Sequence, residues 1–501
     1  MKRKNGKREK KEKIDRNSLR QGRGTGSAVS LYAIGLLLMF IMPWMVYMQG
    51  AGAAWIAIGS FVGMLLVWQM ASYRLMRFSL QQKDQVTIPG FLSRRFQESR
   101  PILKILLSCS ILLLLIPAAT MLMYGIADFA KALFGIPKMY TILGVFLISM
   151  GLFLLFGRSG LRLAERWIAI LVLASLVLID YAIVRVLGTR HILENIFHSW
   201  AAGSVTEYVN VGYMGGRDLS IPEILSLFSF GFLILGNPLV LQRFQLADRA
   251  RTVHRSRRWA VIFSLFALFL SVLTGGLLRA SLYPAKISNI RTLFVTILQE
   301  DKGRGFLFYL TGVIFVAAAG LMTLELLHAC IISASQIVRD NLIPKRHRKV
   351  EMSGSNRRAL LLPVIVIEVV VASLALCSGD WIYTLCLDAY LVLACGLMPV
   401  MYMALRSSRA TARGCLVAFL VGTILAGVWE FSPFIPQGNG FITLHELTGV
   451  VGILPSMMTG FLLGILGNKS AGQPPQEVVS EFEEVQYRLV SSGSKKERAI
   501  R

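Results

Sequence analysis

The stretch AVSLYAIGLLLMFIMPWMVYMQG, residues 28–50, contains no charged side chain and is long enough to cross a lipid bilayer as a helix. The 27 residues before it carry eleven Lys/Arg, three Asp/Glu and no apolar run. A basic flank of this kind is typical of a membrane helix whose N-terminus stays in the cytoplasm. We therefore expect residues 1–27 to form a disordered basic tail in the cytoplasm and not a signal peptide.

Eleven further apolar spans follow this one. Each has the roughly 20 residues that a helix needs to cross about 30 Å of hydrocarbon. The chain is 54% hydrophobic and 16% charged, and only helices satisfy every backbone group within one span. We predict an all-α polytopic membrane protein with one twelve-helix domain over 28–467. The later spans lie at about 53–76, 103–134, 138–156, 166–187, 222–242, 259–283, 305–336, 359–379, 381–405, 414–432 and 448–467.

The basic residues between these spans set the orientation of the chain. With the N-terminus inside, 43 of the 53 Lys/Arg lie on the cytoplasmic side. Both termini are then cytoplasmic, and residues 468–501 form a C-terminal tail in which a weakly structured segment is favoured over the amphipathic helix that 477–490 would allow. The net charge of +25 lies mostly in short loops beside the spans, which favours contact with membrane lipid over nucleic-acid binding. The predicted location is the bacterial inner or plasma membrane, with multiple crossings.

Helix-breaking residues occur in two spans that lie five apart. The first span contains Gly35 and Pro43, and the sixth contains Gly231 and the run Gly236-Asn237-Pro238. Transporters built from two inverted halves interrupt corresponding helices in this way and expose backbone groups near the membrane midplane. The pattern favours a five-plus-five inverted repeat followed by two extra C-terminal helices.

The segment GNPLVLQRFQLAD at 236–248 resembles the signature of the sodium:solute symporter family, with Gly236, Pro238 and Arg243 at the matching positions. Similar stretches in the same order resemble the bacterial proline symporter branch: WIAIG at 55–59, VTIPGFLSRRF at 86–96, ISASQIVRDNL at 332–342 and ARGCLVAFLVG at 412–422. The resemblance implies a LeuT-type bundle that moves a small-molecule solute by alternating access, driven by an ion gradient. It also implies a solute site between the broken first and sixth helices, near Tyr32, Gly35, Phe230 and Gly231.

The sodium site that the resemblance implies is altered in this chain. Family members use backbone carbonyls of the first helix, here of Leu31 and Ile34, and an adjacent hydroxyl pair in the eighth. That pair falls on Leu324 and Glu325, with Thr323 one position earlier, and a usual acidic position of the first helix falls on Ala33. Ordinary sodium coupling is therefore not expected, and the coupling ion is either Na⁺ or H⁺.

Glu325 is the intramembrane acid with the clearest functional interpretation. A charge at the bilayer centre costs on the order of 3 kcal/mol, so such groups usually face a cavity or a partner. Glu325 could bind a proton in place of sodium, pair with a cationic solute, or be a protonated carboxyl that joins two helices. Glu165, which matches a family acid linked to ion release, lies among Arg158, Arg162 and Arg166 and could equally form a salt bridge in that loop.

The combined prediction is a secondary active transporter of the symporter type. A proton-coupled carrier, an uncoupled carrier and a non-transporting sensor or partner subunit remain open on the same fold, and a major-facilitator permease is the alternative fold. No nucleotide-binding motif or catalytic triad occurs, so an enzyme is not expected. No histidine or cysteine cluster has metal-ligand spacing, and no cofactor is predicted. The sequence does not specify an oligomeric state.

Overall fold

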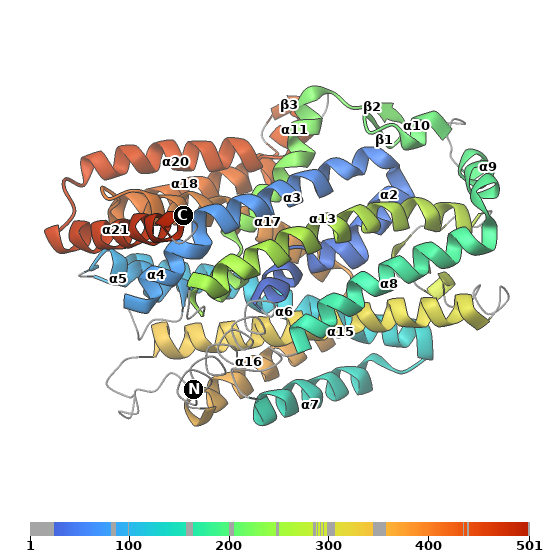
Figure 1. The fold of residues 1–501 in the computed structure, drawn as a ribbon, viewed down its shortest axis with the longest axis horizontal. Helices are drawn as coiled ribbons and strands as arrows, with labels where there is room; N and C mark the ends of the chain where they lie inside the picture. Colours follow the sequence, from blue (N-terminus) through green and yellow to red (C-terminus); the bar gives the residue numbers. More distant parts are fainter. Residues whose placement is uncertain are drawn as a thin grey trace, which may run out of the picture.

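A computed structural model of the chain consists almost entirely of helices packed side by side (Figure 1). Ten helices of the described part are long and apolar enough to cross a membrane, and one bent helix pair brings the number to eleven. The predicted all-α polytopic fold is thereby confirmed. The residues described are 25–81, 87–98, 100–156, 164–199, 205–246, 250–283, 287, 289–290, 292–293, 295–297, 306–343, 357–433, 435–437 and 440–498.

The spans follow the predicted order, with ends that differ by a few residues except at the start of α13, Ala250, which lies nine residues before the predicted 259. The first, Thr25–Gln49, includes η1 (Leu37–Ile41) and α2 (Met42–Gln49), and the second, Ala51–Leu80, includes η2 (Ala51–Ala53), α3 (Ala54–Val67), η3 (Trp68–Ser72) and α4 (Tyr73–Gln81). The next are α6 (Ile102–Phe134), α7 (Lys138–Phe156), α8 (Ala164–Leu187), the pair α11 (Ile221–Ser229) and α12 (Pro238–Gln245) joined by η5 (Phe230–Gly236), α13 (Ala250–Ser281), α15 (Phe306–Ile337) continued by η6 (Val338–Leu342), α16 (Arg357–Cys377), α17 (Trp381–Arg406) and α18 (Ala412–Phe431).

The twelfth predicted span, 448–467, corresponds to the shorter helix α20 (Ile453–Ser470), which packs along α18. It starts later than predicted because the short helix α19 (Leu444–Thr448) ends at Gly449, whose φ of 66° is the left-handed conformation that glycine tolerates. Asn468 and Lys469 lower the hydropathy of α20, so it is not among the ten helices counted above.

The two predicted helix breaks differ in kind. In the sixth span, α11 passes into the 3₁₀ segment η5 and then bends by 41° into α12. The first span was predicted to be broken as well, but it continues as a helix and only widens to a π-helix over η1. The hydroxyl of Ser271 on α13 donates to the Leu38 carbonyl in η1 at 2.6 Å, which satisfies a backbone group inside the membrane without unwinding the helix.

Glycines bring the second span into backbone contact with the broken sixth span. A Cβ on Gly59 of α3 would overlap the Phe228 carbonyl, and one on Gly63 would overlap the Gly231 carbonyl. A Cβ on Gly231 would in turn overlap the Gly59 carbonyl. In lipid, where helix association depends on close packing, small residues at such crossings allow the backbones to touch.

The long outer connection covers the outer end of the first span, next to α2 and α3 (Figure 1). It contains α9 (Thr189–Ser199), α10 (Val205–Val209) and the hairpin of β1 (Tyr213–Met214) with β2 (Arg217–Asp218). The Tyr208 hydroxyl donates to the Val46 carbonyl at 2.9 Å, and the Gly215 amide donates to the Gln49 carbonyl at 3.1 Å. These bonds tie the end of α2 to the outer connection, and the Val46 carbonyl also accepts from the Gly50 amide at 2.9 Å. A second hairpin, β3 (Ile435–Gln437) with β4 (Gly440–Ile442), precedes α19.

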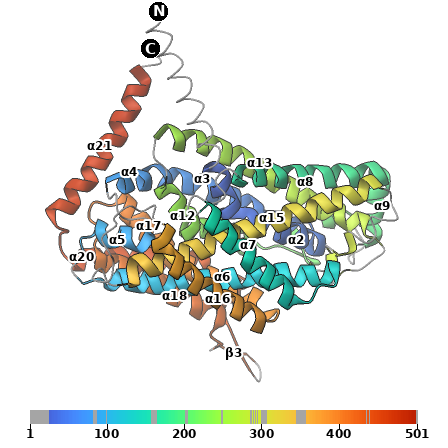
Figure 2. The same ribbon diagram turned by 90° about the horizontal axis from the view of Figure 1, so that it is seen from below.

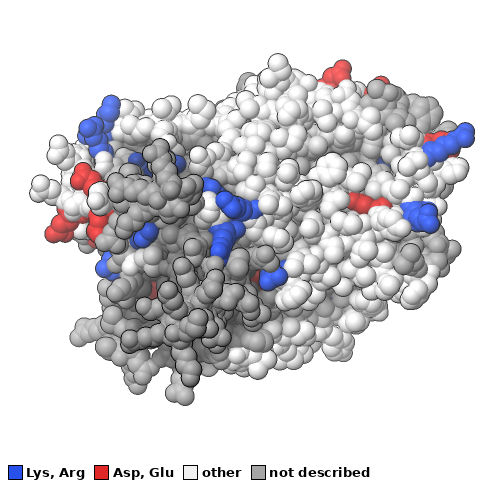
Figure 3. Space-filling view, viewed as in Figure 1, with Lys and Arg blue, Asp and Glu red and all other residues white. Residues whose placement is uncertain are grey.

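The C-terminal tail contains a long helix, α21 (Gln476–Arg498), in place of the weakly structured segment that was favoured. Val478, Phe482 and Val485 are spaced to share one helix face and are all buried, which explains why the segment is ordered. Figure 2 shows α21 running out from the bundle towards the C-terminus. The predicted basic tail, 1–27, lies outside the described residues up to residue 24. Most of the described surface in Figure 3 carries neither Lys/Arg nor Asp/Glu.

We predict that Gly231→Ala destabilises the protein by about 1–3 kcal/mol, because the added methyl group must push α3 and η5 apart. The matched control is Gly320→Ala in α15, where the added Cβ would meet no atom within 4 Å. The control should be neutral or slightly stabilising, because alanine is the better helix former. Thermal unfolding in detergent would measure both variants, and equal melting temperatures would contradict the packing argument.

Candidate transport site

Four polar side chains from four different spans meet in the half of the bundle that the basic residues assign to the cytoplasm. We call this group, formed by Tyr32, Glu165, Arg243 and Glu325, the inner cluster. The Tyr32 hydroxyl donates to Glu325 Oε1 at 3.0 Å and accepts from Arg243 Nη2 at 2.8 Å. Arg243 also forms an ion pair with Glu165 Oε1 and lies 5.1 Å from the Tyr32 ring centroid. The cluster thus connects the first span, α8, α12 and α15.

Asn237, at the break of the sixth span, positions this cluster. Its side-chain oxygen accepts from the backbone amides of Leu239 and Val240, at 3.0 and 3.3 Å, and so caps α12. Its amide nitrogen donates to the Tyr32 carbonyl at 3.1 Å and to the Tyr390 hydroxyl of α17 at 3.4 Å. One side chain therefore fixes where α12 starts and holds it against the first span, which brings Arg243 over the Tyr32 ring.

Three of the four side chains of the inner cluster are almost completely removed from solvent, and the Arg243 side chain is 16% exposed. Tyr32 is 8% exposed, Glu325 3% and Glu165 1%. The cluster contains two carboxyl groups and one guanidinium, and the guanidinium is paired with Glu165. A buried ion pair tolerates its low-dielectric surroundings because the two charges offset one another, whereas a second carboxylate has no such partner.

His328 lies about one turn along α15 from Glu325 and is also buried, at 5% exposed. Within the described part of the chain, neither ring nitrogen of His328 has a hydrogen-bond partner, and neither has Glu325 Oε2. Buried polar atoms without a partner cost about 1–3 kcal/mol each, so their occurrence is usually connected with function or with a bound molecule. The partnerless atoms of Glu325 and His328 are therefore candidate contacts for a polar ligand or a proton.

The residues predicted for solute binding face in different directions. Tyr32 belongs to the inner cluster, and Gly35 faces α15, where a Cβ would lie 2.9 Å from Met322 Sδ. Gly231 faces α3, as described above, and Phe230 lies half-buried beside it in η5. Of the signature residues, Gly236 packs on the Ala394 backbone of α17, while Pro238 begins α12 and Arg243 lies near its end.

The residues predicted for the ion site are placed as follows. Leu31 and Ile34 lie in regular α-helix, so their carbonyls point along the helix axis. The Thr323 hydroxyl donates to the Ala319 carbonyl of its own helix at 2.7 Å. Glu325 is directed towards Tyr32. Glu165 pairs with Arg243 of α12, a contact that the sequence interpretation had not considered.

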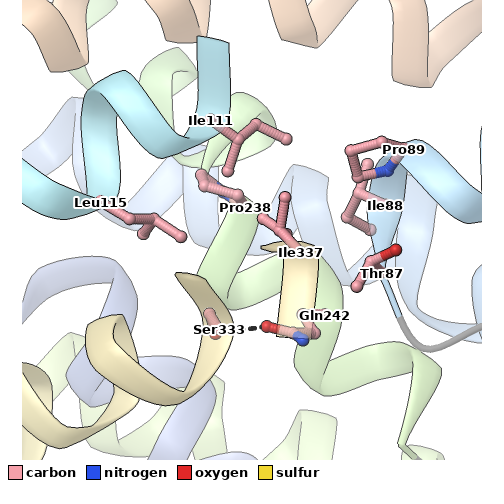
Figure 4. A pocket seen from close by; sticks show the side chains of 9 residues that line it. All are labelled: Thr87, Ile88, Pro89, Ile111, Leu115, Pro238, Gln242, Ser333 and Ile337. Carbon is pink, nitrogen blue, oxygen red and sulfur yellow. Dashed lines mark hydrogen bonds between the residues drawn. The ribbon is translucent and has the colours of Figure 1, made fainter. Parts of the chain in front are cut away.

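A second polar group escaped the sequence interpretation entirely. The Gln242 side chain of α12 donates to Gln336 at 2.6 Å and accepts from the Ser333 hydroxyl at 2.5 Å, both on α15. Gln242 and Ser333 also line a small pocket of about 10 Å³ beneath the helix break (Figure 4). Its lining is Thr87, Ile88, Pro89, Ile111, Leu115, Pro238, Gln242, Ser333 and Ile337. The sequence feature that could have revealed this group is the presence of polar residues, such as Gln242 and Gln336, inside apolar spans.

A bundle whose sixth span is broken in mid-membrane, with buried charged groups joining the broken helix to its neighbours, defines a secondary transporter of the LeuT type. The chain belongs to the sodium:solute symporter family, whose model matches residues 25–422. The predicted family is thereby confirmed, as is the multi-pass location in a bacterial cell membrane.

Two curated relatives are similar over nearly the whole chain. The high-affinity proline transporter PutP of Bacillus subtilis is 24% identical, with 93% of this chain and 94% of the relative covered. The sodium/proline symporter of Staphylococcus aureus strain Newman is 22% identical, with 93% and 89% covered.

Among solved structures, a Na⁺-coupled sialic acid symporter in a substrate-bound outward-open state matches with a TM-score of 0.68 at 16% identity, covering 90% of this chain and 91% of that one. The nucleobase-cation-symport transporter Mhp1 matches with a TM-score of 0.55 at 14% identity, covering 92% and 96%. These likenesses confirm the LeuT-type fold and exclude the major-facilitator alternative.

We predict that Arg243→Met destabilises the protein by about 3–5 kcal/mol, because Glu165 is left buried without a counter-charge. The double variant Arg243→Met/Glu165→Met should be more stable than Arg243→Met alone, since no unpaired charge remains. Thermal unfolding of the wild type, both single variants and the double variant completes the cycle. Strictly additive effects would contradict a direct energetic link between the two side chains.

Proposed function

We propose that this transporter carries a small zwitterionic amino acid, proline or a close analogue, together with a proton that binds Glu325. The solute class is supported by the two relatives, a proline transporter and a sodium/proline symporter, which align over almost their full length. The coupling ion is supported by the charge count of the inner cluster. The positive charge of Arg243 offsets the negative charge of Glu165. The negative charge of Glu325 is then offset by a bound proton.

The proton interpretation is compatible with the hydrogen bonding of Glu325. Its Oε1 accepts from Tyr32, and its Oε2 is a buried oxygen that a proton would convert into a hydrogen-bond donor. The charged or titratable groups that face it are Tyr32 from the first span, Arg243 from α12 and His328 on its own helix. Protonation of Glu325 removes one negative charge from the inner cluster. A neutral carboxyl costs less free energy than a carboxylate in the apolar interior of the membrane.

Sodium coupling has less support in this chain. Sodium prefers several oxygen ligands at short distance, and the eighth-helix positions offer Leu324 and Glu325 where two adjacent hydroxyls are expected. The first span keeps its helical hydrogen bonding at Leu31 and Ile34. An uncoupled carrier and a non-transporting sensor are the remaining alternatives, and the experiment below separates them.

We predict that purified protein in liposomes accumulates labelled proline when the interior is made alkaline relative to the exterior, and that an imposed sodium gradient adds less than about twofold. Glu325→Gln should abolish accumulation driven by the proton gradient, because the amide cannot release a proton. Exchange of labelled for unlabelled proline at equal pH should survive, since the amide resembles the protonated carboxyl. Uptake with time under each gradient is the measurement.

The matched control is Glu368→Gln, which neutralises a fully buried acid on α16, a helix that contributes nothing to the inner cluster. This variant should retain proton-driven uptake. Sodium-driven uptake in the wild type would contradict proton coupling, and equal flux without any gradient would identify an uncoupled carrier. Binding of proline without flux would identify a sensor, and no binding would lead to a wider panel of amino acids, sugars and carboxylates.

A further inference from the structure

The C-terminal helix α21 lies against the connection between the second and third spans. This connection contains the short helix α5 (Ile88–Arg95) and follows α4, the last helix of the second span. Phe482 of α21 packs on Phe78 of α4, with ring centroids 6.4 Å apart. The side chain of Gln97, just after α5, donates to Glu477 of α21 at 2.9 Å. The tail is thus joined by both apolar and polar contacts to a segment more than 370 residues earlier in the chain.

Arg95, the last residue of α5, is the centre of this contact. Its side chain is fully buried, and Nη1 donates to the Val478 carbonyl of α21 at 3.1 Å. The guanidinium lies 5.2 Å from the Phe78 ring centroid and 5.3 Å from that of Phe482, one ring from α4 and one from α21. Burial lowers the pKa of Arg95, while the charge of Glu481 acts in the opposite direction. A guanidinium can be held between aromatic faces in this way because it is planar and weakly hydrated.

The other end of α5 borders the pocket beneath the helix break. Thr87 caps α5 by accepting from the Gly90 amide at 3.3 Å, and Ile88 and Pro89 line the pocket beside it (Figure 4). Thr87 also hydrogen-bonds to Asn341 of η6, at the cytoplasmic end of α15. The helix α5 therefore lies between α21 on one side and the ends of α12 and α15 on the other.

We propose that α21 is a displaceable clamp that holds α5 over this pocket and keeps the cytoplasmic route closed, so that release of α21 frees α5 to move away. The attachment is suited to release. The contacts of α21 include one buried stripe, Val478, Phe482 and Val485, and polar links to Arg95 and Gln97. Residues 471–475, AGQPP, connect it to α20 without helix, with Gly472 at a φ of 80°. The proposal concerns access and holds for any solute or coupling ion.

Cysteine labelling tests the clamp without requiring a transported solute. Ser333→Cys places a thiol on the wall of the pocket, where the native side chain is 7% exposed. A membrane-impermeant maleimide is applied to inside-out vesicles, and modification is quantified at each cysteine by mass spectrometry. In this background we expect truncation before Gln476, and separately Phe482→Ala, to raise the labelling rate at position 333 by at least fivefold. Arg95→Lys should do the same, because lysine keeps the charge but loses the planar group.

Matched controls lie on the same two helices. Arg94→Lys changes the exposed neighbour of Arg95, and Tyr487→Ala removes a side chain that is 74% exposed on α21. Both should leave labelling at position 333 unchanged. The native Cys386, buried on α17, reports on general loosening of the bundle.

A rise at position 333 with Cys386 still protected supports the clamp. An unchanged rate at position 333 after truncation overturns it, and so does a parallel rise at Cys386. Failure of proline uptake in liposomes would leave this result unaffected, so the clamp and the proposed function can fail separately.

Discussion

The hydrogen bonding of Asn237 is the constraint on which the arrangement of the site depends. A helix that breaks inside a membrane leaves amides and carbonyls that water cannot satisfy. In this chain, one side chain accepts from the first two free amides of α12 and donates to the first span and to α17. The break is therefore stable, and the direction of α12 is set by it. Arg243 reaches both Tyr32 and Glu165 because α12 leaves Asn237 at this angle.

The inner cluster shows how a chain can keep charged groups in an apolar bundle. Arg243 is offset by Glu165, and Tyr32 links that pair to Glu325 through a hydroxyl that both donates and accepts. The Tyr32 hydroxyl is neutral, so it links Arg243 to Glu325 by hydrogen bonds without adding a charge. Such a chain of groups is sensitive to the gain or loss of one proton, because every member has few alternative partners.

Much of the fold could be predicted from the sequence, because the length of apolar spans and the distribution of basic residues depend directly on the bilayer. The predicted ends of the first ten spans agree with the helices to within a few residues, except that α13 begins earlier, at Ala250. The π-helix in the first span could not be predicted, since it depends on a hydroxyl from Ser271, more than 200 residues away.

The site was predictable only in part, for a similar reason. A charged residue inside an apolar span, such as Glu325, is visible in the sequence, but its partner is not. Tyr32 and Arg243 were singled out for other roles, and their contact with Glu325 depends on how three helices pack. The amphipathic face of α21 was recognised, yet its order depends on Arg95 and Phe78, which only the folded chain brings beneath it.

The cover formed by α10 and the first hairpin has a mechanical consequence for the first span. Because Val46 and Gln49 are tied to this cover, the outer end of the span cannot shift without breaking those bonds. Any movement of the inner part of the first span must therefore bend the helix, and the π-helical segment η1 is the place where we expect the bend. The inner arm, Thr25–Leu36, is roughly 18 Å long at 1.5 Å per residue. A tilt of about 15° would move its tip by roughly 5 Å. Such a tilt also strains the hydrogen bonds that Tyr32, within this arm, makes with Asn237, Arg243 and Glu325.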